Sequence, residues 1–598
     1  MKLKRTFISI VALMLAVCLM PTALAATWYL EDGDITVIAN ENGQSVKQGS
    51  NSAVADSDTV ITQRDSEKAT DNTITVSTTD DTTANITIED VNINSYGDAI
   101  DVGSSGANIT LEGDNKLNSE YGSGLHVSDG DVTITGSGSL EAGSKNDSNN
   151  NAAIGSHENE AMSGDITIGG DAQVTAVSRD DGAGIGSGDM GEMSGDITIG
   201  DNAQVTAWSE TGGAGIGSGR ESNMSGNITI GGSAQVTAGS NSETAGIGSG
   251  NNGVFTSTGR VVIRDSAKVT AIGENEGAGI GTGEDELMAG MIIIQDNAQV
   301  TAIAGDRAAA IGSDNLDEMT GTIIIIGNAR VTTGILDDDD VYFDYNTKEI
   351  KYTLDENATG YIGDSKYSNH ESDEGHYIIG PDVTINGISG SDIEALKDYI
   401  NMRLSGENHD GEPENLTKLD VRSENGEFTV TAEGEGAVEK ILYGGSENVP
   451  TAPGTYPVTC VVRIGEETIE FQIDTYVVPE PAPQPEPMAH HTRIQLYRVA
   501  DKQGRSIAYK AVQKGGVLTI TTDEKEAQLI IEHGGLFALS RQGITKIVFV
   551  TASKKSAISV GAAMEKGSDE FVLLHGSRKV KLTVAGAAVD ADGILIKE

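Results

Sequence analysis

The stretch GAGIGSG at residues 182–188 has glycine spacing that could bind phosphate through backbone N–H groups. A nucleotide-binding loop of this kind follows a strand and opens a helix, with an acidic residue about 20 positions further on. The next residues here read DMGEMSGDITIG, which do not predict a helix. Variants of the phrase recur at residues 213–219, 245–250, 277–283 and 309–314. A phosphate site occurs once per domain, so the repetition indicates a structural role for these glycines.

Basic residues could instead take a proton from an acidic sugar, as a polysaccharide lyase requires. The best group is Lys268 and Arg330, which occupy one repeating position two units apart, with Arg264 close to Lys268 in sequence. A glycoside hydrolase would need two carboxylates about 5 to 9.5 Å apart. The surrounding units are nearly interchangeable, whereas an active site should interrupt them, so we expect a solvated face and no catalytic residue. His126 and His157 lie in polar, loop-like sequence and show no metal-ligand spacing.

Aromatic residues offer a second chemistry, the stacking of sugar rings. Trp208 is the large aromatic residue of the repeats, and its ring either stacks on a sugar or fills the space above Gly239. A tyrosine-rich segment follows the last repeat and contains Tyr342, Tyr345 and Tyr352. These rings either cap the end of the repeats or form a binding platform.

Acidic residues dominate the charge of the chain, which is −50 overall. Such a surface repels nucleic acid and anionic lipid, but it tolerates divalent cations and neutral partners such as uncharged glycans. The run Asp337, Asp338, Asp339 and Asp340 could bind Ca²⁺ through carboxylate oxygens. Calcium is therefore a possible ligand, and the sequence implies no other cofactor.

The elements that position these residues repeat with a fixed period. Aligned on the central isoleucine, the units fall at Ile154, Ile185, Ile216, Ile247, Ile280 and Ile311, at intervals of 31, 31, 31, 33 and 31 residues. Within each unit, apolar and polar residues alternate with a period of two, as in DITI and AQVTA, which predicts strands. Three shorter units precede them, with the strands NITI, NITL and DVTI spaced by 23 residues. A fixed period in this range predicts a solenoid.

Invariant columns predict how the coils stack. The position before the central glutamine of AQVTA is alanine in all six long units, which suits a narrow interior, and the position after its valine is threonine, which suits an outward strand surface. Short polar residues such as Asp171 and Asn202 occupy a corner, where they can bond to their stacked neighbours. We expect the glycines to allow positive φ and close approach, with the isoleucine pointing inward. The predicted fold is an all-β parallel β-helix.

The pattern of GAGIGSG followed by GDITIGGDAQVTA resembles the glycine-rich β-strand repeats of secreted and surface proteins of gut-type bacteria, which are adhesin-like or carbohydrate-binding. The resemblance covers about residues 85–335 and implies a fold and an adhesive role, with no binding residue. A second phrase, VPTAPGTYPVTCVV, resembles the closing strands of bacterial immunoglobulin-like surface modules over about residues 416–478. That resemblance implies a spacer domain of β-sandwich form.

Composition shifts divide the chain into seven segments. These are a signal peptide at 1–25, an N-terminal cap at 26–72, β-helix repeats at 73–336, a C-terminal cap at 337–381, a short helix with the immunoglobulin-like domain at 382–478, a proline-rich linker at 479–491, and a small β-rich domain at 492–598. Basic residues followed by an apolar run and Ala-Leu-Ala mark the signal peptide, and no membrane span is expected after its removal.

These features predict a protein that is secreted and either free or associated with a cell surface. The mature chain keeps one cysteine, Cys460, so its stability outside the cell must come without an internal disulfide. We expect a non-enzymatic protein that functions in adhesion or carbohydrate binding, with an extracellular glycan or a host or cell-surface component as partner. The alternatives are a polysaccharide lyase or glycoside hydrolase of the β-helix type, and a purely structural spacer.

Overall fold

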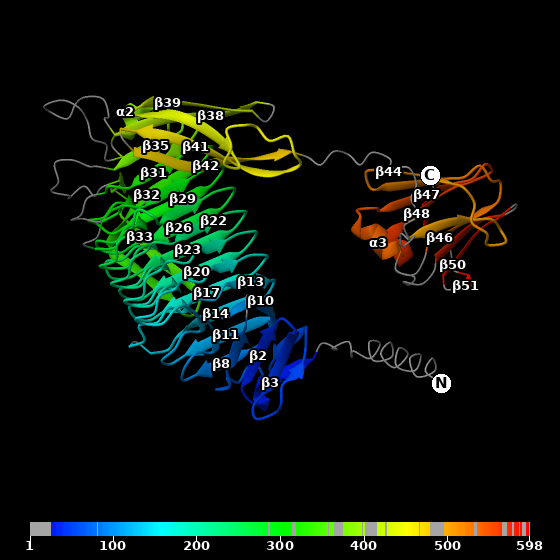
Figure 1. Cartoon of the computed structure of the whole chain (residues 1–598), viewed down its shortest axis with the longest axis horizontal. Helices are drawn as coiled ribbons and strands as arrows, with labels where there is room; N and C mark the ends of the chain where they lie inside the picture. The colour runs from blue at the N-terminus through cyan, green and yellow to red at the C-terminus, as the bar shows by residue number, and fades with distance from the viewer. Residues whose placement is uncertain are drawn as a thin grey trace, which may run out of the picture. The chain divides into compact units, whose positions relative to one another are not determined.

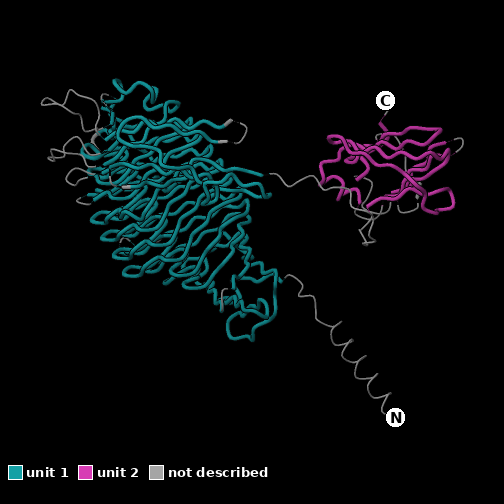
Figure 2. Tube along the Cα trace, turned by 45° about the horizontal axis from the view of Figure 1, so that its top comes forward, with its two compact units in different colours: residues 1–480 teal, residues 481–598 magenta. Residues whose placement is uncertain are grey.

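The computed structural model describes residues 26–596, apart from residues 80–81, 147, 285–286, 314–318, 357, 364–374, 398, 401–414, 425–426, 466, 479–495, 532–534, 565–570, 577–578, 585–586 and 589–593. The expected signal peptide and proline-rich linker thus lie outside the described residues. The chain forms two compact units, residues 1–480 and 481–598 (Figure 2). Each unit has a core of its own.

The first unit is a solenoid of three long sheets, which confirms the expected parallel β-helix (Figure 1). Sheet A has 14 strands in the order β1 (Thr27–Tyr29), β5 (Thr59–Thr62), β7 (Thr83–Glu89), β10 (Gly106–Glu112), β13 (Val132–Gly136), β16 (Ile166–Ile168), β19 (Ile197–Ile199), β22 (Asn227–Ile230), β25 (Arg260–Ile263), β28 (Met291–Ile294), β31 (Thr322–Ile325), β35 (His376–Ile379), β38 (Leu416–Glu424) and β39 (Glu427–Gly434).

Sheet B has 13 strands in the order β34 (Ile362–Gly363), β30 (Ile311–Gly312), β27 (Ile280–Gly281), β24 (Ile247–Gly248), β21 (Ile216–Gly217), β18 (Ile185–Gly186), β15 (Ile154–Gly155), β12 (Leu125–Val127), β9 (Ile100–Gly103), β6 (Ile74–Thr78), β2 (Ile35–Asn40), β3 (Gly43–Gln48) and β4 (Val54–Ala55). A short 3-10 turn, η1, spans Leu30–Asp32.

Sheet C has 12 strands in the order β37 (Ile388–Ser389), β36 (Thr384–Ile385), β32 (Arg330–Asp344), β29 (Gln299–Ala304), β26 (Lys268–Ile272), β23 (Gln235–Ser240), β20 (Gln204–Ser209), β17 (Gln173–Ser178), β14 (Ser139–Ser144), β11 (Asp114–Ser119) and β8 (Asn92–Ser95), with β33 (Glu349–Leu354) beside β32.

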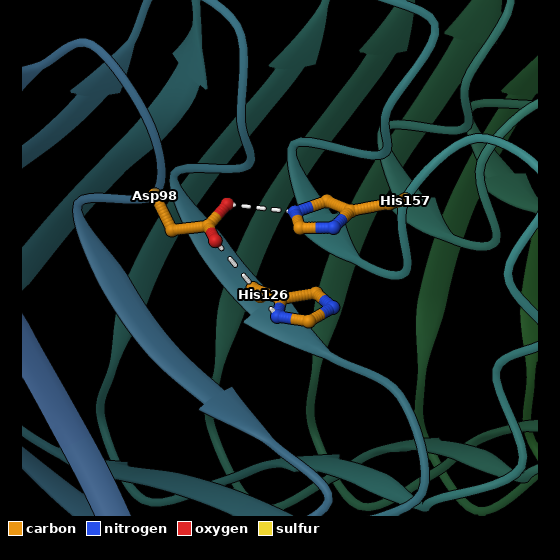
Figure 3. Close-up of side chains that lie close together, drawn as sticks. All are labelled: Asp98, His126 and His157. Atoms are coloured by element: carbon orange, nitrogen blue, oxygen red, sulfur yellow. Dashed lines mark hydrogen bonds and ion pairs between the residues drawn. The ribbon is translucent and has the colours of Figure 1, made fainter.

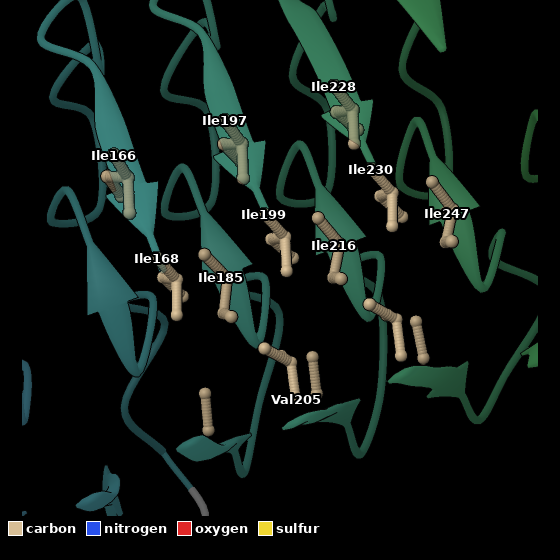
Figure 4. Packing of buried hydrophobic residues seen from close by; sticks show 14 of the residues in the cluster. Ile166, Ile168, Ile185, Ile197, Ile199, Val205, Ile216, Ile228, Ile230 and Ile247 are labelled. Carbon is tan, nitrogen blue, oxygen red and sulfur yellow. The ribbon is translucent and has the colours of Figure 1, made fainter. Parts of the chain in front are cut away.

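Isoleucines of successive coils stack into the solenoid core (Figure 4). Ile166, Ile197 and Ile228 pair in register along sheet A, and all three side chains are fully buried. Burying each such side chain contributes about 1.5 to 3 kcal/mol. Alanines such as Ala172 line the narrower parts and are also fully buried, as the repeat pattern predicts. The period of two in the sequence therefore maps directly onto the inward and outward faces of these strands.

Glycine allows the coils to approach closely in sheet B. Gly186 has φ of 142° and pairs in register with Gly217, which has the same φ. A Cβ added at Gly186 would overlap the carbonyl oxygen of Gly217. The isoleucine before each of these glycines is fully buried, so the structural interpretation of GAGIGSG is confirmed.

Methionine forms a further internal column that the sequence analysis did not identify. In each long coil one residue makes an isolated parallel bridge to the next coil, between sheets B and A in sequence. The members of the column are Met162, Met193, Met224, Phe255, Met288 and Met319, and all are fully buried. The 31-residue coil thus fills its longer corner with flexible apolar side chains, which adapt well to irregular space.

A β-hairpin covers part of the outer surface of sheet C. Strand β32 continues past the last repeat and pairs antiparallel with β33, which returns beside β20 and β23. Phe343 and Ile350 of this hairpin pack into a small apolar cluster with Trp208 and Ile303. The tyrosine-rich segment therefore lies along the side of the solenoid in its first part, while β34 and β35 add strands to sheets B and A.

The ends of the solenoid are closed by different elements. At the N-terminal end, β3 pairs antiparallel with β2, within the segment expected to be a cap. At the other end, the short helix α2 (Ile393–Leu396) begins after Asp392, whose side chain accepts a hydrogen bond from the backbone N–H of Ala395 at 3.3 Å. Leu396 and the nearby Ile400 join the solenoid core. An apolar end of the core is thus covered rather than left open for a second copy to extend.

Among the described residues of the segment that resembles an immunoglobulin-like module, β38 and β39 extend sheet A of the solenoid. The antiparallel strands that follow are β40 (Gly436–Tyr443), β41 (Gly454–Ile464) and β42 (Glu467–Val478), which form one three-stranded sheet and not a two-sheet sandwich. They share a core with outward-facing isoleucines of sheet A, including Ile324 and Ile378. Cys460 is buried in this core, and burial raises the pKa of its thiol to about 12. The thiol is therefore a packing group, in agreement with the sequence interpretation.

In its described part, the second unit contains two five-stranded sheets and two short helices around a separate apolar core. One sheet has the order β43 (Tyr497–Ala500), β46 (Ala527–Ile531), β49 (Phe571–His575), β50 (Val580–Val584) and β51 (Ala587–Ala588). The other consists of β44 (Lys510–Lys514), β45 (Val517–Thr521), β47 (Lys546–Val550), β48 (Lys555–Ser559) and β52 (Leu595–Ile596), and the helices are α3 (Gly535–Arg541) and α4 (Val560–Met564).

Candidate functional site

The short and long coils meet at a corner that gathers polar side chains. Asp98 precedes β9, His126 lies within β12, and His157 follows β15. These three strands are neighbours in sheet B, with Ile100, Leu125 and Ile154 in register. Residues that are 59 positions apart in sequence are thereby brought together.

The two imidazole rings stack against each other beside a shared carboxylate. The ring centroids of His126 and His157 are 3.8 Å apart, and the ring planes differ by 3°. Oδ1 of Asp98 lies 2.7 Å from Nε2 of His157, and Oδ2 lies 3.9 Å from Nδ1 of His126 (Figure 3). The backbone N–H of Ser123 donates to Oδ1 of Asp98 at 2.7 Å and fixes the carboxylate.

Two further carboxylates complete the cluster. Oδ1 of Asp101 lies 2.9 Å from Nδ1 of His126, and Oε2 of Glu160 lies 2.8 Å from Nε2 of the same ring. Glu160 also approaches Nδ1 of His157, at 3.6 Å. We call Asp98, Asp101, His126, His157 and Glu160 the junction cluster.

Electrostatics favour a charged imidazole in the junction cluster. Burial alone lowers the pKa of His126, but the hydrogen bonds with Asp101 and Glu160 and the charge of Asp98 raise it to about 9. Burial likewise raises the pKa of Asp98, yet the neighbouring His157 and His126 hold that pKa below its usual range. The contacts of the cluster are therefore charge-assisted, because the carboxylates raise the pKa of His126 by more than burial lowers it.

Chain register explains why these side chains fit only at the junction. In sheet B, Asp101 pairs with His126, and His126 pairs with Gly155 of the first long coil. Every later coil keeps glycine at that position, through Gly186 and on to Gly312. Because a Cβ at Gly155 would overlap the carbonyl of Gly186, long coils have no room there for a functional side chain.

An exposed pair of tyrosines lies in the same corner loops. Tyr96 precedes Asp98 by two residues, and Tyr121 precedes Ser123 by two. Their ring centroids are 4.7 Å apart, and the residues are 73% and 53% exposed. The backbone N–H of Tyr121 donates to the carbonyl of Tyr96 at 2.9 Å, so the rings are held on adjacent coils. The two exposed rings lie side by side and form an aromatic surface next to the polar corner residues Asp98 and Ser123.

A polar groove of about 330 Å³ crosses sheet C on the same short coils. Asn92, Lys116 and Glu141 line it from β8, β11 and β14, where they stand in register. Asp90 and Asp114 add two carboxylates to its lining. The short coils thus present polar side chains on two faces, whereas the long coils repeat uniform columns.

A larger cavity of about 530 Å³ lies near the C-terminal end of the first unit. Its lining includes Pro381, Lys418, Asp420 and Arg422. Nη2 of Arg422 is ion-paired with Asp420 at 2.7 Å, so these two charges satisfy each other within the lining. The junction cluster, in contrast, gathers several titratable groups around shared atoms.

The residues predicted from the sequence to bind ligand are not brought together with this site. Trp208 is fully buried, and its ring packs against Gly239 and Ile350, so it has no face open to a sugar and is not a binding residue. The alternative interpretation, that the ring fills the space above Gly239, agrees with the structure. A bulky ring is stable here because the hairpin covers it.

The tyrosines of the hairpin lie outside the junction cluster, although Lys348 in the turn of the hairpin contacts Glu141 of β14. Tyr342 is half-exposed on the strand β32. Tyr345 donates a hydrogen bond to Glu210, and the guanidinium of Arg179 lies 4.4 Å from its ring centroid. Tyr352 pairs with Val341 and is also partly exposed. These rings serve hairpin packing as well as offering surface, and no contact links them to the junction cluster among the described residues.

Asp337 of the acidic run and the basic pair of Lys268 and Arg330 stand outside the junction cluster. Asp337 is exposed, and the side chains of Asp338, Asp339 and Asp340 lie outside the described residues. Lys268 and Arg330 both pair with Gln299 of the intervening coil, are exposed, and stand two coils apart as the sequence predicts. Nε of Arg264 lies 3.9 Å from a carboxylate oxygen of Asp265.

The junction cluster was missed because its histidines were judged by their sequence spacing. His126 and His157 show no metal-ligand spacing along the sequence, yet the solenoid stacks their loops one above the other, so that their donor atoms and that of Asp98 lie within 4.8 Å of one another. One sequence signal pointed to the site. Aligning Ile100, Leu125 and Ile154 puts Asp101 and His126 where later units have glycine, and this interruption is what an active or binding site in a repeat should produce.

Among the described residues, no helix is long and apolar enough to cross a bilayer. Comparison of the chain with protein-family models, with curated proteins and with solved structures finds no match. The resemblance drawn from the repeats is therefore supported at the level of the parallel β-helix alone. Function must be argued from the site itself.

Proposed function

We propose that this protein is a secreted or cell-surface, non-enzymatic protein that binds carbohydrate and serves in adhesion, with its binding site at the junction of short and long coils. The observation that carries the proposal is the exposed tyrosine pair, Tyr96 and Tyr121, on adjacent coils. Contiguous exposed apolar surface marks an interaction site, whereas single exposed apolar side chains are common, and these two rings are in contact with each other. The partner is an extracellular glycan or another cell-surface component.

Sugar is the chemistry that fits the junction best. One face of a pyranose ring is lined by C–H groups, which pack on an aromatic face, while its hydroxyls need hydrogen-bond partners. The carboxylate of Asp98 stands in the same corner, and that of Glu160 holds the opposite edge of the stacked histidines; both can accept such bonds. The acidic net charge of −50 favours a neutral polysaccharide over a uronate-rich one.

Three features support an extracellular role. The N-terminal residues have the composition of a signal peptide, and the repeats resemble those of adhesin-like surface proteins. The buried thiol of Cys460 is protected from oxidation by its packing, which suits a chain that works outside a reducing compartment. The solenoid would then act as a rigid support that holds the junction away from its attachment point.

The experiment is binding of the chain from Ala26 onward to a panel of neutral and acidic polysaccharides, with released sugars measured in the same wells. Binding to a neutral polysaccharide without released product supports the proposal. Released unsaturated or reducing sugars would replace it with the lyase or hydrolase alternative. No binding and no product across the panel would favour the spacer alternative.

A further inference from the structure

Each histidine of the junction cluster turns its two ring nitrogens toward two different carboxylates. On one side, Nδ1 of His126 and Nε2 of His157 face Asp98, at 3.9 and 2.7 Å from its two oxygens. On the other side, Nε2 of His126 and Nδ1 of His157 face the same oxygen of Glu160, at 2.8 and 3.6 Å. One edge of the stacked pair is therefore directed at Asp98, and the opposite edge is held by Glu160.

Nitrogen and oxygen donors converge on the Asp98 side. One nitrogen from each histidine and one oxygen of Asp98 all lie within 4.8 Å of one another. Oδ1 of Asp101 lies 2.9 Å from Nδ1 of His126, so a fourth donor is in reach. Two imidazole nitrogens with carboxylate oxygens match the four-coordinate donor sets that proteins use for zinc.

We propose that Asp98, His126 and His157 bind one divalent transition-metal ion of the zinc class, with Asp101 as a fourth ligand and Glu160 positioning both imidazoles. Imidazole ligands select this class over Ca²⁺ and Mg²⁺, which prefer oxygen donors alone. A carboxylate on the far nitrogen of each ligating histidine is the usual outer support, since it orients the ring. The site is distinct from the calcium hypothesis for Asp337 to Asp340 and does not depend on sugar binding.

Charge and access both suit a cation here. Asp98, Asp101 and Glu160 bring three carboxylates to two histidines, so a divalent ion that displaces the proton from His126 still meets a negatively charged set of ligands. The side chains of His157 and Glu160 are about one third exposed, at 32% and 38%, which leaves a path from solvent. Asp98 is held more deeply, with Ser123 fixing one of its oxygens. Asp98 is thus the deeper ligand, and His157 and Glu160 are the groups that solvent can reach.

Binding requires a small rearrangement of the rings. The imidazole planes differ by 3° and their centroids lie 3.8 Å apart, so their in-plane lone pairs run parallel instead of meeting at one point. Zinc sits about 2.0 to 2.1 Å from each ligating nitrogen. The rings must therefore tilt toward each other around the ion. The absorption bands of bound Co²⁺ report the resulting four-coordinate geometry, which a purely structural cluster would not form.

The test is titration of the chelator-treated chain from Ala26 with Co²⁺ and with Zn²⁺. The parent chain and every variant carry His490→Gln and His491→Gln, because adjacent histidines can bind zinc by themselves. We expect one Co²⁺ per chain with visible absorption bands typical of four-coordinate cobalt, displaced by one equivalent of Zn²⁺. Calorimetry with Ca²⁺ should give binding at least about a hundredfold weaker than with Zn²⁺.

Variants separate ligation from packing. His157→Gln should abolish the cobalt bands, and Glu160→Gln should keep them while weakening binding about 10- to 100-fold. His376→Gln is the matched control, because His376 is also partly buried beside a carboxylate, 3.1 Å from Glu435, outside the junction. It should bind like the parent chain. Circular dichroism of each variant checks that the solenoid is folded.

Three results would overturn the proposal. The first is the absence of a one-to-one complex with the folded parent chain. The second is parent-like cobalt binding by a folded His157→Gln variant, which would place the ion elsewhere. The third is Ca²⁺ binding as tight as Zn²⁺ binding, which would indicate an acidic site with no role for imidazole. If His157→Gln fails to fold, the metal affinity of Glu160→Gln and the absorption bands of Co²⁺ bound to the parent chain decide the outcome.

Discussion

The short coils that end near residue 144 and the long coils that follow share three sheets, yet they use the corner between sheets C and B differently. The short coils place Tyr96, Asp98 and Tyr121 in that corner and Asp101 and His126 in the strands that follow it. The long coils place glycine at the matching strand position, packed against the glycine of the next coil. Regular stacking gives the long coils a dense interior. Titratable side chains therefore fit only where the short coils meet the long ones.

The largest expected effect comes from adding one methyl group to the regular coils. Gly186→Ala should lower the free energy of unfolding of the first unit by about 4 kcal/mol, since the Cβ overlaps Gly217 and φ is 142°. Urea unfolding followed by tryptophan fluorescence measures it, because both tryptophans, Trp28 and Trp208, lie in this unit.

Gly200→Ala is the control in the same coil. No atom lies within 4 Å of a Cβ built at Gly200, so this variant should change the free energy of unfolding by less than about 0.5 kcal/mol. Equal effects of the two variants would show that close glycine contact in sheet B is not what limits side chains there. The comparison of short and long coils would then lose its physical basis.

A second prediction tests whether carboxylates, rather than burial, set the charge of the junction histidines. His575 of the second unit is buried with the hydroxyls of Thr551 at 3.1 Å and Ser556 at 2.9 Å, without a carboxylate in those contacts. Burial, helped by the charge of Lys554, lowers the pKa of His575 to about 4. A buried histidine with these partners therefore titrates in the opposite direction from His126.

The consequence is a pH-dependent stability of the second unit. The unfolded histidine, with a pKa near 6.5, binds a proton before the folded one does. Stability is therefore complete above about pH 6.5 and falls by roughly 1 kcal/mol per pH unit as pH drops toward 4. Calorimetry should show this in the transition that lacks a tryptophan signal, and His575→Asn should flatten it. If the stability of the second unit in the parent chain does not change between about pH 6.5 and 4, the predicted contrast between His575 and His126 is wrong.

The smallest expected effect is that of the basic column on the long coils. Replacing Lys268 and Arg330 together by alanine should leave both polysaccharide binding and the absence of released sugar unchanged, because the two side chains are exposed and belong to a uniform face. The assay is the polysaccharide panel with product detection. Loss of sugar release from a parent chain that produced it would move the active region to the long coils.

The fold could be predicted from the sequence because its signals are local and repeated. The period-two alternation, the invariant alanines and the recurring glycines each map onto one face or corner of a coil, so the parallel β-helix followed from the pattern. The position of the hairpin over Trp208 could not be predicted. The apolar residues of the hairpin alternate along one short segment, and this pattern predicts a strand but does not identify the surface that the strand covers. Partners separated by more than a hundred residues leave no periodic signal.

The site was harder to predict because it exists at a change of period. His126 belongs to a 23-residue coil, and His157 and Glu160 belong to the first 31-residue coil, so an alignment within either class separates them. Their contact depends on how two coils of different length stack, which the register in sheet B fixes. Tyr96 and Tyr121 could not be predicted for the same reason, because they belong to short units whose period differs from that of the long ones.

The most direct test of the account is the affinity of three chains for a neutral polysaccharide bound by the parent chain. These are the parent, the double variant Tyr96→Ala and Tyr121→Ala, and Tyr342→Ala, which removes a comparably exposed ring from the hairpin. The account predicts that the double variant loses at least about tenfold in affinity while Tyr342→Ala binds like the parent. Unchanged binding by the double variant, or a loss confined to Tyr342→Ala, would contradict the placement of the site at the junction.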